Sequence, residues 1–194
     1  MQRKQEGCLR MLVHNTTGIG FCSQTRNKET LKMEKLRRLV INHDVDILGL
    51  TETNKRWSVI PEENTIWSAV NKWKEHTRTY ATYNKTDPGK SEQLYGGTAI
   101  SVFNENIFHI QNKGEDKRSL GRWNWIELQG KNNFNTTVIC AYCPCISNGP
   151  HSVWSQHILA MNDLEPEDQG KDPRELFWSD LTDLVKEKNK KERI

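Results

Sequence analysis

Long apolar runs are missing from this 194-residue sequence, and no stretch approaches the roughly 20 apolar residues that a membrane-spanning helix needs. The first residues, MQRKQEGCLRMLVH, lack the apolar core of a secretion signal. Cysteine is scarce, and its count of five is odd. A complete disulfide framework is therefore not expected, because one cysteine would stay unpaired. These absences favour an intracellular protein in a reducing compartment, without a membrane partner.

Strong net charge, internal repeats and low-complexity segments are also absent. The chain has 28 Lys and Arg against 25 Asp and Glu, and the resulting net charge of +3 permits a nucleic-acid partner without requiring one. Mean hydropathy is low at −0.81, but seven Trp and several apolar runs argue against disorder. The length suffices for one domain with a sizeable core.

A carboxylate stands directly after a short apolar run. The segment Val45–Leu50, VDILGL, predicts a buried strand, and the polar residues Thr51, Glu52 and Thr53 follow it. A carboxylate at the end of a buried strand is held stiffly and still reaches solvent. Ligand sites in sheets packed against helices gather at the carboxyl ends of strands, so Glu52 is the first candidate site residue.

A helix separates this strand from an earlier one. Leu9–His14 predicts a strand that ends at Asn15, and Asn27 is a suitable N-cap for a helix. Helical spacing then follows in Leu31, Leu36, Leu39 and Val40. Strand, helix and strand in this order form a unit with two parallel strands. We therefore expect Asn15 and Glu52 to lie at the same end of neighbouring strands.

The rest of the chain predicts short antiparallel strands followed by two helices. The expected strands are Thr79–Tyr83, Tyr95–Phe103, Ile107–Ile110, Trp123–Leu128 and Thr136–Tyr142. Gly96 and Gly97 indicate a close backbone approach at a strand start. Helical patterns begin at Ser152 and cover Arg174–Lys188. Three of the tryptophans are expected in the core: Trp123, Trp154 and Trp178.

The order of the motifs adds a family resemblance. An early Asn after a strand is followed by DILGLTET, YGGTAISV, GRW and CAYCP, across Leu9–Cys145. This order resembles the endonuclease/exonuclease/phosphatase superfamily, and within it the endonuclease domains of non-LTR retrotransposon reverse transcriptases and their apurinic-endonuclease relatives. The resemblance implies an α/β (α+β) fold, the DNase I-like four-layer α/β/β/α sandwich.

The same resemblance implies roles for four residues. Glu52 matches the metal-binding glutamate of the family, and Asn15 matches its early active-site asparagine, which orients metal and phosphate. Tyr142 matches the catalytic tyrosine beside the attacked phosphate, and Arg122 resembles a basic residue that holds a phosphate oxygen. The implied cofactor is Mg²⁺, with Mn²⁺ as the alternative, since both accept oxygen ligands.

The sequence also departs from the family pattern. Cys145 stands where many relatives have an asparagine, and Thr17 where some have an aspartate. The later family motifs, Gly-Asp-x-Asn and Ser-Asp-His, are absent. We therefore expect residues 1–194 to form a single incomplete domain, C-terminally truncated, with weak metal binding and no activity alone.

Several functions remain open. The resemblance implies DNA as substrate, a reverse transcriptase as the C-terminal partner in the parent protein, and a nuclear location. The alternatives are a catalytically dead remnant that at most binds nucleic acid weakly, a phosphatase or sphingomyelinase, or an apurinic endonuclease. Cys140, Cys143 and Cys145 suggest a zinc site but lack a fourth ligand, and Cys140 is better explained as a small buried strand residue.

Overall fold

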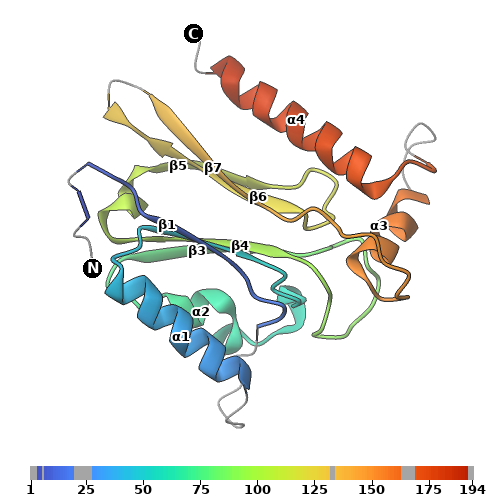
Figure 1. The fold of residues 1–194 in the computed structure, drawn as a ribbon, viewed down its shortest axis with the longest axis horizontal. Coiled ribbons are helices and arrows are strands. Elements are labelled where there is room, and N and C mark those ends of the chain that lie inside the picture. The colour runs from blue at the N-terminus through green and yellow to red at the C-terminus, as the bar shows by residue number, and fades with distance from the viewer. Residues whose placement is uncertain (1–3, 6, 20–27, 132–133, 163–168, 192–194) are drawn as a thin grey trace.

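The computed structural model describes residues 4–5, 7–19, 28–131, 134–162 and 169–191, which form four layers (Figure 1). Two helices, α1 (Lys28–Asn42) and α2 (Ile66–Val70), cover one face of a four-stranded sheet. A three-stranded sheet packs on its other face, and α4 (Pro173–Lys191) covers the outer side of that second sheet. This confirms the α/β/β/α layering that the sequence predicted.

The four-stranded sheet has the order β1-β2-β4-β3. Its strands are β1 (Met11–Asn15), β2 (Ile47–Thr51), β3 (Thr77–Thr82) and β4 (Thr98–Phe103). β1 and β2 are parallel and joined through α1, which confirms the predicted strand–helix–strand unit, and the other pairs are antiparallel. The proposed N-cap Asn27 lies outside the described residues.

The second sheet is an antiparallel meander of β5 (Ile110–Glu115), β6 (Trp123–Gln129) and β7 (Asn135–Ala141). The predicted strand Ile107–Ile110 is wrong, because residues Asn104–His109 form a 3-10 helix before β5. Asn104 has a positive φ of 58°, which turns the chain out of β4. The Asn106 side chain donates to the Phe103 carbonyl at 3.1 Å and stabilises that turn.

Two further helices and two short helical turns complete the chain. They are α3 (Val153–Asn162), α4, and 3-10 turns at Trp57–Val59 and Glu62–Asn64. α2 has no counterpart in the predicted elements; it is capped by Thr65, whose side chain accepts a hydrogen bond from the Ser68 amide. Among the described residues, no helix is long and apolar enough to cross a membrane.

Three apolar clusters fill the spaces between the layers. Met33, Leu36 and Val40 of α1 pack on the first sheet, together with Leu48 and Leu50. Between the sheets lie Ile47, Ile100, Val102, Ile126, Leu128 and Cys140, and outside the second sheet lie Trp123, Phe177 and Leu184. Each cluster removes apolar surface from water, which is the main stabilising term of the fold.

Some residues of the predicted buried stripes face outward instead. Trp178 is 56% exposed because its neighbour Phe177 occupies the space against Trp123, and Trp154 is only partly buried. Leu31 and Leu39 of α1 are also exposed, since Met33, Leu36 and Val40 form the buried face. Trp123 and Cys140 are buried as predicted.

Candidate functional site

Glu52 is the first residue after β2 and has a left-handed backbone conformation. Its φ is 52°, and two nearby residues, Thr17 and Asn54, have φ values of 47° and 53°. Left-handed backbone is unfavourable for residues other than glycine and persists only where surrounding contacts enforce it. Three such residues line one cavity, so backbone strain is concentrated around the Glu52 carboxylate.

Hydrogen bonds from the turn after β1 hold the Glu52 backbone in place. The Glu52 carbonyl accepts from the Thr16 hydroxyl at 2.7 Å and from the Gly18 amide at 2.8 Å. Thr16 is fully buried, so its hydroxyl is a fixed donor. The parallel pairing of β1 and β2 brings these two turns together at the same edge of the sheet.

Glu52 opens into a cavity of about 490 Å³. Its wall comes from the turns after β1 and β2, from the segment before β4, and from the loop between β7 and α3. The lining residues are Thr17, Glu52, Asn54, Tyr95, Tyr142, Cys145, Ser147, Gly149, Pro150, His151, Ser152 and Val153. The cavity therefore combines one carboxylate with two phenols, an imidazole, a thiol and several hydroxyl groups.

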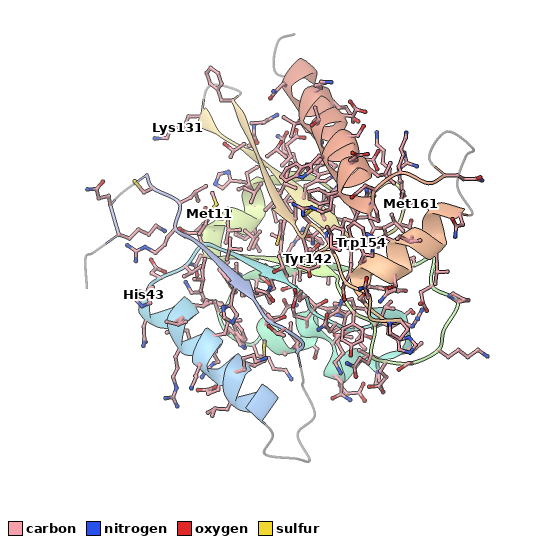
Figure 2. All side chains as sticks on the ribbon, turned by 45° about the vertical axis from the view of Figure 1, so that its right-hand side comes forward. Met11, His43, Lys131, Tyr142, Trp154 and Met161 are labelled. Atoms are coloured by element: carbon pink, nitrogen blue, oxygen red, sulfur yellow. The ribbon has the colours of Figure 1, made fainter. Side chains whose placement is uncertain are left out.

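Tyr142 reaches this cavity from the second sheet. It follows β7 where the chain leaves the sheet toward α3 (Figure 2), and its amide donates to the Arg122 carbonyl at 2.8 Å. Burial raises the pKa of Tyr142, and a hydrogen bond with Glu52 and proximity to Cys145 raise it further. The phenol therefore stays protonated near neutral pH and acts as a hydrogen-bond donor.

Asn15 lies at the predicted end of the sheet but outside the cavity lining. It pairs with Thr51 in the parallel ladder, which confirms that Asn15 and Glu52 follow neighbouring strand ends. Its side-chain oxygen accepts from the Thr17 amide at 3.0 Å and so fixes the turn that carries Thr17 into the cavity. The structure thus places Asn15 beside the site without making it a wall residue.

Arg122 does not lie on the rim of the cavity, and this part of the prediction is wrong. The residue is 1% exposed, and its guanidinium bonds Asp116 at 2.6 and 2.7 Å and Asp180 of α4 at 2.7 Å. The ring of Trp123 lies 4.4 Å from its guanidinium carbon. Two carboxylates and an aromatic face hold this side chain between β6 and α4, so it cannot reach a phosphate in the cavity.

The cavity also contains residues that the sequence analysis did not select. Tyr95, the first residue of the YGGTAISV motif, and His151 line it, and neither was assigned a role in the site. The sequence did indicate this region through Gly96 and Gly97, where a close approach between backbone segments was predicted at the start of a strand. Both have positive φ, and a Cβ at Gly97 would lie 2.7 Å from the Thr53 hydroxyl, which confirms that approach.

The chain is similar to several solved structures at low sequence identity. An endonuclease/exonuclease/phosphatase family protein from Leptotrichia buccalis is 15% identical with a TM-score of 0.48, covering 81% of this chain and 64% of the other. A protein of that family from Beutenbergia cavernae is 10% identical with a TM-score of 0.45, covering 81% and 44%. A 3′ phosphatase from Neisseria bound to a product DNA hairpin is 13% identical with a TM-score of 0.42, covering 70% and 42%.

The chain spans 42–64% of the length of these three structures. No protein-family model matches the sequence, and no curated protein matches it. The case for a function therefore rests on the residues of this chain.

Proposed function

We propose that the cavity between Glu52 and Tyr142 is a divalent-cation-dependent phosphodiester site, belonging to a DNA endonuclease domain of the retrotransposon type. The observation that carries the proposal is the meeting of these two residues. Glu52 follows a strand of the first sheet, Tyr142 follows a strand of the second, and the two side chains line one cavity, close enough for the Glu52 carboxylate to raise the pKa of the Tyr142 phenol. The motif order in the sequence supports DNA as the substrate.

The donor set of the cavity fits a small hard cation. Glu52 would hold Mg²⁺, or Mn²⁺ as the alternative, because these ions take carboxylate oxygens and retain several waters. When bound, the cation supplies positive charge that stabilises the negative charge developing on a phosphoryl group. Tyr142 donates a hydrogen bond to a phosphate oxygen from its protonated phenol. Asn15 lies next to the cavity and fixes the Thr17 turn.

Cation binding is expected to be weak in this chain. Within the described ranges no group of three or more His, Cys, Asp or Glu is placed to hold a metal, and Glu52 is the only carboxylate of the cavity wall. Mg²⁺ gives up its waters reluctantly, so one carboxylate holds it loosely. Paramagnetic Mn²⁺ should broaden the amide signals of residues around Glu52 and Tyr142 at high concentration, and Mg²⁺ should compete.

Two variants decide whether Glu52 is the ligand. Glu52→Gln should remove the Mn²⁺ broadening, whereas Glu62→Gln, an exposed carboxylate outside the cavity, should leave it unchanged. Broadening that persists in Glu52→Gln would reject Glu52 as the ligand. Micromolar Mg²⁺ affinity in calorimetry would contradict the expected weakness.

A second candidate function is nucleic-acid binding without hydrolysis, favoured by the single carboxylate of the cavity. Supercoiled plasmid separates the two. We expect residues 1–194 to bind without nicking in Mg²⁺. Nicking that disappears in Glu52→Ala would establish phosphodiester hydrolysis and show that the expected inactivity is wrong.

The retrotransposon type has its own test in the coding sequence after Ile194. An in-frame Gly-Asp-x-Asn motif followed by a reverse transcriptase would support a retrotransposon parent and a nuclear site of action. A stop codon directly after Ile194 would favour a remnant.

A further inference from the structure

A second cavity adjoins the one that contains Glu52. It has a volume of about 620 Å³ and lies between the loop around Pro88 and the start of α3. Three residues line both cavities: Tyr95, Pro150 and His151. The two hollows are therefore neighbours that share a wall, and an extended ligand bound beside Glu52 would continue past Tyr95 into the second cavity.

Tyr95 is exposed, yet its backbone is tightly held. The side chain is 43% exposed. The following residue, Gly96, accepts from the Asn54 amide at 2.8 Å and donates to the Asn54 side chain at 2.8 Å. On the other side, Lys55 and Gln93 form an antiparallel bridge. These contacts tie the Tyr95 segment to the loop that follows Glu52, so the Tyr95 backbone keeps a set position relative to the site.

Arg56 builds the far side of the second cavity. Its buried guanidinium pairs with the Asp87 carboxylate and donates to the carbonyls of Asp87 at 2.9 Å and Ser91 at 3.1 Å. The Asp87 side chain also accepts from the Gly89 amide at 2.8 Å. The loop is thereby shaped around Arg56, and it presents the exposed Lys90 on the cavity wall.

We infer that Tyr95 stacks on a nucleobase next to the phosphate bound at Glu52, and that Lys90 contacts a phosphate further along the same DNA strand. Single-stranded nucleic acid is bound by aromatic side chains that stack on bases and by cations that follow the backbone. An exposed aromatic ring, with a proline and an imidazole on the same wall and a lysine beyond, supplies both features. This inference rests on the proposed function, because it takes the Glu52 cavity as the phosphate site.

The test compares two single strands of equal length and charge, one with ordinary bases and one in which every base is removed. Affinity for each is measured by fluorescence anisotropy in Mg²⁺. Tyr95→Ala should weaken the ordinary strand about tenfold and leave the abasic strand unchanged, because only the first has a face to stack on. Tyr95→Phe keeps the aromatic face and should bind both strands as the original protein does.

Lys90→Ala should weaken both strands alike and make binding less dependent on salt, as expected for loss of a phosphate contact. Phe108→Ala is the matched control, since this ring is 65% exposed and lines neither cavity. It should leave both affinities unchanged. A 2-aminopurine moved along the strand should be quenched at one position in the original protein and in Tyr95→Phe, but not in Tyr95→Ala.

The outcomes separate the inference from the proposed function. Equal loss on both strands, or no loss, in Tyr95→Ala overturns base stacking even where Glu52→Gln abolishes the dependence of binding on Mg²⁺. If Tyr95→Ala weakens binding of the ordinary strand alone while Glu52→Gln changes nothing, the stacking stands and the phosphodiester site fails. Absence of binding to either strand overturns both.

Discussion

At the scale of single residues, Glu52 combines a functional side chain with an unfavourable backbone conformation. Its φ of 52° is one that glycine adopts without the cost that a Cβ imposes. We expect Glu52→Gly to be more stable than Glu52→Ala by about 1 kcal/mol, because both variants lose the carboxylate and only glycine relieves the strain. Urea denaturation of the two variants measures this difference.

The paired design removes the side chain from the comparison. Both variants should lose the Mn²⁺ response, so any stability difference between them reports the backbone alone. Equal free energies of unfolding would show that the left-handed conformation at Glu52 carries no strain. A Glu52→Gly variant that is more stable than the original protein but shows no Mn²⁺ broadening would show that the original protein keeps the Glu52 carboxylate at a cost in stability.

His157 on α3 makes folding sensitive to acid. Its pKa is lowered to about 4, chiefly by burial and next by the nearby Arg122 guanidinium, while Asp116 opposes the change. In the unfolded chain His157 binds a proton as pH falls below about 6.5, whereas in the folded chain it stays neutral until about pH 4. The free energy of unfolding therefore decreases as pH falls from about 6.5 to about 4. The fully developed loss is roughly 3 kcal/mol, since one pKa unit corresponds to about 1.4 kcal/mol.

Thermal unfolding at a series of pH values measures this dependence. His157→Gln cannot take up the proton, so its stability should decline less between pH 6.5 and 4 than that of the original protein. His109→Gln changes an exposed histidine and should keep the original slope. An unchanged slope in His157→Gln would exclude His157 as the acid-sensitive group.

At the scale of elements, a buried charge network fastens α4 to the second sheet. Arg122, next to β6, bonds Asp116 and Asp180, and Arg118 bonds the same Asp180 at 2.7 Å. Removing one partner of a buried pair leaves an uncompensated charge. We therefore expect Arg122→Ala to lower the free energy of unfolding by about 3–5 kcal/mol, measured in urea.

Exposed ion pairs provide the contrast. Arg38 pairs with Glu34 on the surface of α1 at 3.2 Å, and Arg38→Ala should cost less than about 1 kcal/mol. The double variant Arg122→Met with Asp116→Leu should recover part of the loss, because no lone charge stays buried. A cost for Arg122→Ala as small as that for Arg38→Ala would refute the structural role given to Arg122.

At the scale of the whole molecule, two strand edges flank an apolar hollow. In the described sheets β1 and β7 are outermost, and a cavity of about 240 Å³ between them is lined by residues of both, including Met11 and Val138. Val13 on β1 is 70% exposed, and Met11, labelled in Figure 2, is exposed on the same strand. Uncovered apolar edges of this kind favour association between chains.

A charge placed on this edge should reduce association. We expect Val13→Lys to lower concentration-dependent light scattering several-fold, because lysine on an edge strand opposes pairing with another chain. Val59→Lys adds the same charge at an exposed valine of a 3-10 turn and should have little effect. Similar scattering from both variants would show that net charge, rather than the β1 edge, controls association.

The strand–helix–strand unit and the first half of the site were predictable because they depend on local pattern, whereas the four layers were implied by the family resemblance. The apolar run before Glu52 and the periodic Leu36 and Val40 specify a strand and a helix, and their order requires parallel strands. That requirement put Asn15 and Glu52 at one sheet edge, as the structure confirms. The end of the predicted strand at Phe103 was correct, but the 3-10 helix Asn104–His109 was missed, because the left-handed Asn104 turns the chain after β4.

Amino-acid order by itself determined the strand–helix–strand unit, the Glu52 strand end and the buried Cys140, and the family resemblance of its motifs implied the four layers. Only tertiary structure decided which side chains share a cavity. The family resemblance assigned Arg122 to a phosphate, but in the structure its guanidinium bonds Asp180, which lies 58 residues later in the chain. His151 lines the cavity without any local signal in the sequence, and for Tyr95 the adjacent Gly96 and Gly97 indicated a close backbone approach but not a place in the site. Contacts between residues far apart in the chain depend on how layers pack, and that information is absent from the periodicity of any one segment.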